Sequence, residues 1–400
     1  MFKTLALWST VCVLTVFSTG CWDSTEINQL AIVTASACDA APQTGQGKKS
    51  SDRSVLASVQ IALPNQLQGS QSQTGSAGSG GQGTFIVETE KGPSPASALL
   101  AVQKRLSRRF FLADRRVIII GEAYARQGIS ALLDEMVRNP TGRLRVYILV
   151  AHHARGLDLL GLNYPLNRVP ADAILELEDS RTFVAMNLVQ FIKAMTDGSD
   201  AYAMGIKPHP QKLDHSAVPF TLDQVAVFRK DRLVGWLSKE ETKGFYTIYE
   251  QANQLRFGMN VLSVPGYAGL ITSKLTHIHS SLSPVWRRHT LAMNVHVKMS
   301  YQIIENNTSL NLDHAEDLRL YERQLKKQVQ QQIAKAISAL QHKYDADCLQ
   351  FGKLVHERYP RQWHSLGPRW HSVWPTVTPK IHVDITVPGS GNLSDAIEAF

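Results

Sequence analysis

The hydrophobic pattern of the chain changes about halfway along its length, and this change constrains the fold more than any other feature. Up to about residue 196, short apolar runs alternate with amphipathic stretches, as where Val117–Gly121 is followed by Glu122–Arg138. This order predicts buried strands alternating with helices. Farther on, Met293–Ile303 alternates apolar and polar residues without interruption, which predicts a long antiparallel strand with one face on a core. We therefore predict a mixed α/β and α+β fold, in which an N-terminal α/β part is followed by an antiparallel sheet with a long packed helix.

The elements of the N-terminal part can be placed from local patterns. Ser94-Pro95 has the sequence of a helix start, with a serine N-cap and a proline in the first turn. The predicted strands are Leu30–Ala35, Val55–Leu63, Thr84–Glu88, Val117–Gly121 and Leu144–Val150, and the predicted helices begin at Ser94 and cover Glu122–Arg138 and Ser180–Met195.

The longest helical signal runs from Leu318 to about Val355. One apolar stripe follows this segment and includes Cys348, while Lys, Gln and Glu fill the other positions. A stripe of this width favours packing across a sheet, and a coiled-coil partner is the alternative. Near the end, Ile381–Val387 alternates again and predicts a strand that can join the same sheet.

A charged turn is predicted between two apolar strands. Val225–Phe228 and Leu233–Leu237 flank the four residues Arg229-Lys230-Asp231-Arg232, which is a hairpin signal. We favour the interpretation that the charges keep this turn solvated. The alternative is that Lys230, Asp231 and Arg232 contact a partner protein.

The domain organisation follows from length and from breaks in the pattern. Four hundred residues predict two or three domains. Asp197-Gly198-Ser199 interrupts the chain after a predicted helix and marks a boundary. We predict a signal peptide at 1–20, an N-terminal domain at 21–196, a middle domain at 197–280 and a C-terminal α+β domain at 281–400. Residues 65–83, rich in Gly, Ser and Gln, predict a flexible loop inside the first domain.

The first twenty residues have the organisation of a secretory signal. Lys3 supplies a positive charge, and Leu5–Phe17 is an uncharged, mostly apolar run too short for a permanent transmembrane helix. Small residues then lead into Cys21, as in bacterial lipoproteins. We predict that Cys21 becomes an S-diacylglycerol cysteine, with N-acylation as an option, and that the lipid tethers the mature chain to a membrane. An ordinary signal peptide with an incidental cysteine is the alternative.

The charge and the cysteine content of the chain exclude few further classes of protein. The formal net charge is +8, which attracts anionic surfaces, but no nucleic-acid-binding motif occurs and we predict no nucleic-acid partner. Cys38 and Cys348 lie in apolar contexts, and we interpret both as small buried hydrophobic residues, with a disulfide as the minority option.

We find no set of residues that predicts catalysis. His152 and His153 would point to opposite faces of a strand, whereas His277 and His279 would share a face and could chelate. No Cys or acidic residue stands at a recurring ligand spacing beside them, so we predict no metal site. Nucleophile-elbow, phosphate-loop and zinc-protease motifs are missing from the sequence. We predict that the chain is not an enzyme and holds no cofactor.

Several segments together resemble a known family. They are Cys21-Trp22-Asp23 with Glu26-Ile27, Glu90-Lys91-Gly92-Pro93-Ser94, Phe111 through Ile120-Gly121-Glu122, Gly128-Ile129 with Leu133-Asp134 and Arg138, Ala226–Leu237, Glu241–Gly244, Asp345, Phe351-Gly352, Tyr359-Pro360 and Trp363. In collinear order over nearly the whole mature chain, they are similar to the Ger(x)C spore germination lipoproteins, the C subunits of GerA-type germinant receptors. Ser18, three residues before Cys21, and the Gly/Ser/Gln-rich loop depart from the family pattern.

The resemblance implies a function as well as a fold. It implies a three-domain mixed α/β lipoprotein on the outer face of the inner spore membrane, where it works with integral-membrane A- and B-type receptor subunits. The germinant would be bound by those partner subunits, so this chain is expected to be a structural or coupling subunit. The competing hypothesis is a solute-binding lipoprotein of a transporter, which would need two similar α/β lobes around a cleft.

Overall fold

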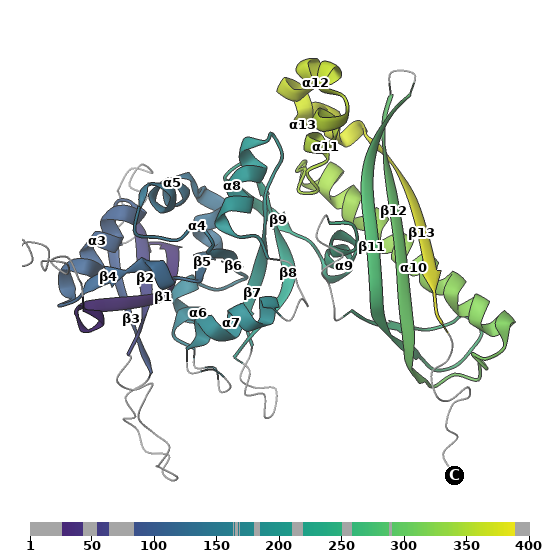
Figure 1. Ribbon diagram of the computed structural model, residues 1–400, viewed down its shortest axis with the longest axis horizontal. Coiled ribbons are helices and arrows are strands. Elements are labelled where there is room, and N and C mark those ends of the chain that lie inside the picture. The colour runs from purple at the N-terminus through teal and green to yellow at the C-terminus, as the bar shows by residue number, and fades with distance from the viewer. Residues whose placement is uncertain are drawn as a thin grey trace, which may run out of the picture.

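A computed structural model describes residues 26–388, except 43–53, 64–83, 163, 165–166, 168, 180–184, 210–218, 250–257 and 288–289. The predicted signal peptide, Cys21 and the predicted loop at 65–83 lie outside the described residues. Two sheets, each with its own helices, make up the described part of the chain (Figure 1). The predicted mixed α/β, multi-domain fold class is confirmed.

The first sheet has nine strands and a parallel centre. Strands β1, β5, β6 and β7 pair in parallel, and antiparallel strands extend the sheet at both ends. β5 is buried along its whole length, as its apolar sequence predicts. In spatial order the strands are β3 (Phe85–Gly92), β2 (Val55–Ala62), β1 (Leu30–Ala40), β5 (Val117–Gly121), β6 (Tyr147–Ala151), β7 (Tyr202–Pro208), β8 (Phe220–Arg229) and β9 (Arg232–Trp236), and β4 (Arg109–Phe111) also pairs with β1.

Six helices of the described chain accompany this sheet. Ser94 caps the first of them with the predicted capping geometry, because its side chain accepts a hydrogen bond from the backbone N–H of Ser97. The helices are α3 (Pro95–Arg105), α4 (Glu122–Gln127), α5 (Ser130–Arg138), α6 (Gly156–Leu160), α7 (Pro170–Asp179) and α8 (Leu188–Thr196).

The single helix predicted over 122–138 is wrong, because the chain bends between α4 and α5. Gly128 has a φ of 113°, a conformation that side-chain-bearing residues rarely adopt. The bend is also fixed from outside, since the backbone N–H of Ile129 donates a hydrogen bond to the carbonyl of Asp231 at 3.0 Å.

The second sheet has four strands, β10 (Met259–Leu262), β11 (Ile271–Arg287), β12 (Thr290–Asn306) and β13 (Thr378–Thr386). From Leu291 to Ile303, buried residues alternate with half-buried or exposed ones along β12, which confirms the predicted long half-buried strand. The predicted last strand joins this sheet, but it runs parallel to β12. The sheet is therefore mixed, and the predicted all-antiparallel pairing is corrected at this edge.

Helix α10 (Ala315–Ser338) packs on one face of the second sheet and buries its apolar stripe there, as predicted (Figure 1). Its Gln332 backbone lies so close to α9 (Lys239–Ile248) that a Cβ on Gly244 would come within 2.0 Å of the Gln332 carbonyl oxygen. The glycine thus permits the close contact between these two helices. The remaining helices are α11 (Phe351–Arg358), α12 (Pro360–Leu366) and α13 (Trp370–Val373).

The long helix ends earlier than the sequence predicts. After Ser338 it continues only through a π-helical turn at Ala339–Lys343, and Asp345 and Gln350 then take left-handed φ values of 48° and 57°. Cys348 lies in the loop that follows. It is still buried and unpaired, as is Cys38, which confirms the interpretation of both as buried free cysteines.

Two predicted domain boundaries fall inside continuous sheets. Strands β7, β8 and β9 follow residue 197 and belong to the first sheet, and β11 runs through residue 281. Asp197-Gly198-Ser199 is the connection between α8 and β7, so its break-forming residues mark a turn within the fold. Among the helices of the described residues, none is long and apolar enough to cross a membrane.

Candidate functional site

The charged turn predicted between two strands lies where the two sheets meet. It is tighter than predicted, with Arg229 paired to Arg232 and only Lys230 and Asp231 between the strands. The backbone N–H of Lys230 donates to Oδ1 of Asp200 at 2.9 Å. The Arg229 guanidinium lies 2.6 Å from Oδ2 of Asp345, in the loop after α10.

Asp231 fixes the same turn to the bend between α4 and α5. The hydroxyl of Ser130 donates to Oδ2 of Asp231 at 2.6 Å, in addition to the backbone bond from Ile129. The side chains of Lys230 and Arg232 are exposed. The backbone of the turn thus holds neighbouring parts of the fold together, while the cationic side chains of Lys230 and Arg232 face solvent.

Asp347 is the fully buried centre of this junction. Its carboxylate accepts three hydrogen bonds, from the backbone N–H groups of Phe351 at 2.9 Å and Gly352 at 2.7 Å and from the indole N–H of Trp370 at 2.9 Å. The first two bonds satisfy amides in the first turn of α11, which have no partner within that helix. One side chain therefore positions α11 and, through Trp370, α13.

Asp200 connects this centre to the first sheet. Its Oδ2 accepts a hydrogen bond from the Asp347 backbone N–H at 2.9 Å, and its own N–H donates to the Asp347 carbonyl at 3.2 Å. Asp200 directly precedes the β7 region, so the pair of aspartates joins the first sheet to the segment between α10 and α11. We call Asp200, Arg229, Asp345, Asp347 and Trp370 the junction cluster.

Burial controls the charge of the junction cluster. Desolvation raises the pKa of Asp347 to about 7, and the hydrogen bonds from Gly352, Phe351 and Trp370 oppose this change. Burial also raises the pKa of Asp200, against the hydrogen bonds from Lys230 and Asp347 and the nearby His371, whose Nδ1 lies 3.9 Å away. The neighbouring Asp200 carboxylate also raises the pKa of Asp347, because a second negative charge nearby disfavours ionisation.

A second link reinforces the junction along β9. The Tyr344 hydroxyl donates to the carbonyl of Trp236 at 2.5 Å, and the Trp236 indole N–H donates to Oε1 of Glu122 at 3.1 Å. The thiol of Cys348 lies 3.2 Å from the carbonyl of Ala201. The contacts of Tyr344 and Cys348 join the segment after α10 to the first sheet, and the Trp236–Glu122 bond joins β9 to α4.

Sequence reasoning found part of this site. It singled out the turn at 229–232 but missed Asp200 and Asp347. The signal that could have found Asp347 was the pair of acidic residues in Asp345-Ala346-Asp347, which predicts a helix end better than a continuing helix. No comparable signal marks Asp200.

The histidines weighed as metal ligands are not brought to the junction cluster. His277 and His279 are both exposed on β11, whereas His152 is buried and contacts Trp236 in a tilted arrangement with ring centroids 4.1 Å apart. Within the described ranges, no three His, Cys, Asp or Glu side chains are grouped so that they could hold a metal ion.

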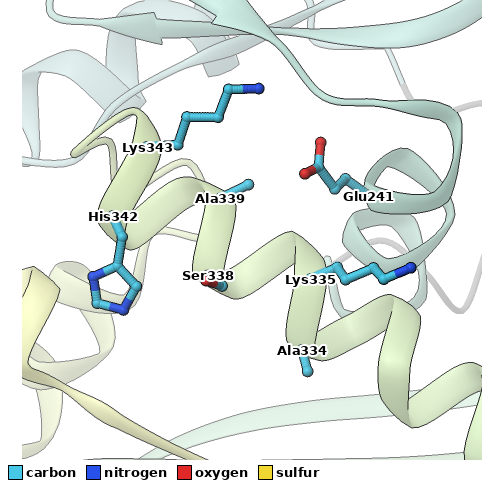
Figure 2. Close-up of a pocket in the computed structure, with 7 residues that line it drawn as sticks. All are labelled: Glu241, Ala334, Lys335, Ser338, Ala339, His342 and Lys343. Atoms are coloured by element: carbon cyan, nitrogen blue, oxygen red, sulfur yellow. The ribbon is translucent and has the colours of Figure 1, made fainter.

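Two grooves lie on the surface near the junction. One, of about 570 Å³, separates α9 from the end of α10, and Figure 2 shows Glu241 on its α9 side facing Lys335 and Lys343 on the other. The second, of about 710 Å³, lies between the end of α8 and helices α11 and α12, where Trp363 stacks on His356. Both grooves mix cations and carboxylates.

These features define a multi-domain protein of mixed α/β architecture in which a buried polar junction joins two different sheets. Two family models match the chain. "Spore germination protein N-terminal domain" matches residues 23–208, and "Spore germination B3/GerAC like, C-terminal" matches residues 223–391.

Relatives match over nearly the whole length. The putative spore germination protein YfkR of Bacillus subtilis (strain 168) is 28% identical, covering 97% of this chain and 96% of the relative. Spore germination protein KC of the same organism is 22% identical over 92% and 90% of the two chains. The crystal structure of the GerBC protein matches with a TM-score of 0.56 at 15% identity, covering 85% of this chain and 96% of that one, which supports the fold.

The chain belongs to the Ger(x)C family of spore germination proteins. The predicted membership is confirmed, and with it a role in spore germination.

The junction cluster predicts a pH-dependent stability. Because the folded-state pKa of Asp347 is raised to about 7 from 3.8, the folded chain binds more protons than the unfolded chain between these values, and stability falls as pH rises through that window. A tenfold difference in proton affinity between the two states corresponds to about 1.4 kcal/mol. We expect the free energy of unfolding to decrease from pH 5 to pH 7 and to level off above pH 8, as measured by chemical denaturation.

Asp347→Asn should flatten this slope, whatever its effect on stability at a single pH. Asp134→Asn, at an exposed helix position, is the control and should keep the wild-type slope. An unchanged slope in Asp347→Asn would assign the pH dependence to other groups.

Proposed function

We propose that this chain is a lipid-anchored, extracytoplasmic subunit of a spore germinant receptor. In this proposal Cys21 holds the lipid on the outer face of the inner spore membrane. The chain then acts as a structural or coupling subunit beside integral-membrane A- and B-type subunits, which bind the germinant. Family membership over both parts of the chain supports the role in germination.

The observation that carries the coupling role is the junction cluster. Its buried charged groups bind the chain's own backbone and side chains: Asp347 accepts from Phe351, Gly352 and Trp370, and Asp200 accepts from Lys230 and Asp347. Groups used in this way connect elements and are not free to bind or transform a substrate. A body whose two sheets are linked by buried bonds is suited to passing a displacement from one end to the other.

The same contacts favour a non-enzymatic role. Catalytic groups with shifted pKa values face a pocket in which a substrate can reach them. Here the two carboxylates with raised pKa values at the junction are buried among peptide groups. The solute-binding alternative requires two similar α/β lobes, whereas the described chain pairs a nine-stranded mixed sheet with a four-stranded sheet under one long helix.

The anchor makes the first prediction of this proposal. A diacylated cysteine provides two acyl chains, which is what stable membrane attachment requires. Cys21→Ala should therefore move the protein from the membrane pellet to the soluble or unprocessed fraction, as measured by fractionation and immunoblotting. Cys38→Ala, a change at a buried cysteine, should leave the protein in the pellet. A Cys21→Ala variant that fractionates like the wild type would refute the anchor.

The exposed cations of the charged turn make the second prediction. Charge reversal by Lys230→Glu and Arg232→Glu should lower co-purification with the membrane subunits by roughly tenfold. Charges at an interface steer the partner during association and fix its orientation. Folding should change by no more than about 0.5 kcal/mol, as is usual for surface sites. Arg143→Glu with Arg145→Glu, also at exposed positions, is the matched control. If both variants co-purify with the membrane subunits to the same extent, the turn does not contact a partner and its charges only keep it solvated.

A further inference from the structure

Cationic side chains gather at one edge of the first sheet, where its parallel strands begin. β1 and β4 start side by side at this edge, and the ends of α3 and α5 lead into it. The exposed cations here are Lys104 and Arg105 at the end of α3, Arg108 and Arg109 around the start of β4, Arg138 at the end of α5, and Arg143 and Arg145 before β6. We call these seven residues the basic edge.

Hydrogen bonds hold the segments of the basic edge together. The side chain of Gln103, near the end of α3, donates to the carbonyl of Arg108 at 2.8 Å and accepts from the backbone N–H of Phe110 at 2.7 Å. The backbone N–H of Tyr147 donates to the Arg116 carbonyl at 2.8 Å, which ties the end of the loop after α5 to the start of β5. The cations of both segments therefore lie on the same side of the sheet.

Most of the charge of the basic edge is not neutralised by neighbouring carboxylates. Arg105 pairs with Glu90 and Arg138 with Asp134. Of the other carboxylates nearby, Glu26 is exposed, whereas Glu88 and Glu135 are half-buried, and Asp114 and Asp172 both pair with Arg116. The cations of the edge that form no ion pair within the described residues are Lys104, Arg108, Arg109, Arg143 and Arg145.

A buried arginine adds positive charge beneath the edge. Arg115 is 4% exposed, and a Cβ on Gly142 would lie 3.5 Å from one of its terminal nitrogens, so its guanidinium lies under the loop after α5. It forms no ion pair with a described carboxylate, and Glu135 acts on it only from a distance. A buried cation of this kind raises the positive potential at the surface above it.

Large apolar side chains are exposed among these cations. Leu144 lies between Arg143 and Arg145 in the sequence and is 45% exposed, and Val137, next to Arg138, is 53% exposed. Cations beside exposed apolar groups suit the interface of a bilayer, where anionic headgroups attract the cations and the acyl boundary accepts the apolar groups.

The start of the chain indicates the bilayer as the occupant of this surface. Strand β1 begins at the basic edge, where Leu30 pairs with Arg109, and Leu30 stands nine residues after Cys21. Nine residues span at most about 30 Å even when fully extended. With the lipid of the proposed anchor on Cys21, the basic edge therefore stays within that distance of the membrane.

We propose that the basic edge lies against the anionic headgroups of the bilayer, with the guanidinium groups of Arg108, Arg109, Arg143 and Arg145 on the lipid phosphates. Guanidinium groups suit this role because they bind phosphate through two parallel hydrogen bonds. The choice of occupant rests on the proposed anchor. The contact would orient the first sheet so that the carboxyl ends of its parallel strands point away from the membrane.

Co-sedimentation with vesicles tests this contact in the absence of the anchor. The mature chain is produced from residue 22, which removes the predicted signal peptide and Cys21 and keeps every described residue. It is mixed at low ionic strength with vesicles of phosphatidylglycerol and phosphatidylcholine, or of phosphatidylcholine alone. Two edge variants, Arg108→Glu with Arg109→Glu and Arg143→Glu with Arg145→Glu, are compared with Lys230→Glu and Arg232→Glu, the matched control that changes the net charge equally.

We expect the mature chain to sediment with the anionic vesicles and not with phosphatidylcholine alone. Each edge variant should lower the bound fraction several-fold, whereas the control should keep it. Physiological salt should release the chain because it screens the attraction, so a Cys21→Ala variant still leaves the membrane pellet. Retention of the wild-type protein on membranes washed with high salt reports the anchor, so failure of the anchor and failure of the edge give different results.

Three results would overturn the proposal. One is no binding of the mature chain to anionic vesicles, and another is an equal loss of binding in the control and edge variants, which would assign binding to net charge alone. The third is unchanged vesicle binding of both edge variants. If these variants also failed to co-purify with the membrane subunits in detergent, where no bilayer is present, the edge would be assigned to a protein partner.

Discussion

Burying the Asp347 carboxylate costs free energy that only its hydrogen bonds offset, and those bonds determine how the second half of the molecule meets the first. The amides of Phe351 and Gly352 start α11, and the Trp370 indole brings α13 to the same carboxylate. Asp200 then ties the loop to the first sheet. Because a buried acceptor without its donors is expensive, these elements hold one another in a single arrangement.

The second half of the molecule depends on this arrangement in turn. Helix α10 packs along the second sheet and delivers Tyr344 and Asp345 to the first sheet, where they meet Trp236 and Arg229. Close packing at Gly244 holds α9 against the middle of the same helix. A displacement at either sheet would therefore be transmitted along α10 to the junction cluster, which is the physical basis of the proposed coupling role.

Much of the fold follows from local patterns, whereas the junction cluster does not. Val117–Gly121 and the alternating residues of β12 are strands because their hydrophobic periods allow little else. The helix bend at Gly128 and the helix end near Asp345 depend on contacts with residues about a hundred positions away, Asp231 and Arg229. Asp197-Gly198-Ser199 predicts a turn, and the sequence alone does not tell whether that turn lies inside a domain or between domains, because Asp, Gly and Ser favour turns in both places. Asp200 and Asp347 look like surface acids until the fold buries them.

Native-state hydrogen exchange tests the central claim that the junction joins the two sheets into one cooperative unit. The amides of Phe351 and Gly352, bound to Asp347, and of Lys230, bound to Asp200, should exchange as slowly as core amides of β5 such as Ile119, which open only on global unfolding. Fast exchange of these three amides, while both sheets stay protected, would mean that the junction opens independently and would contradict the account.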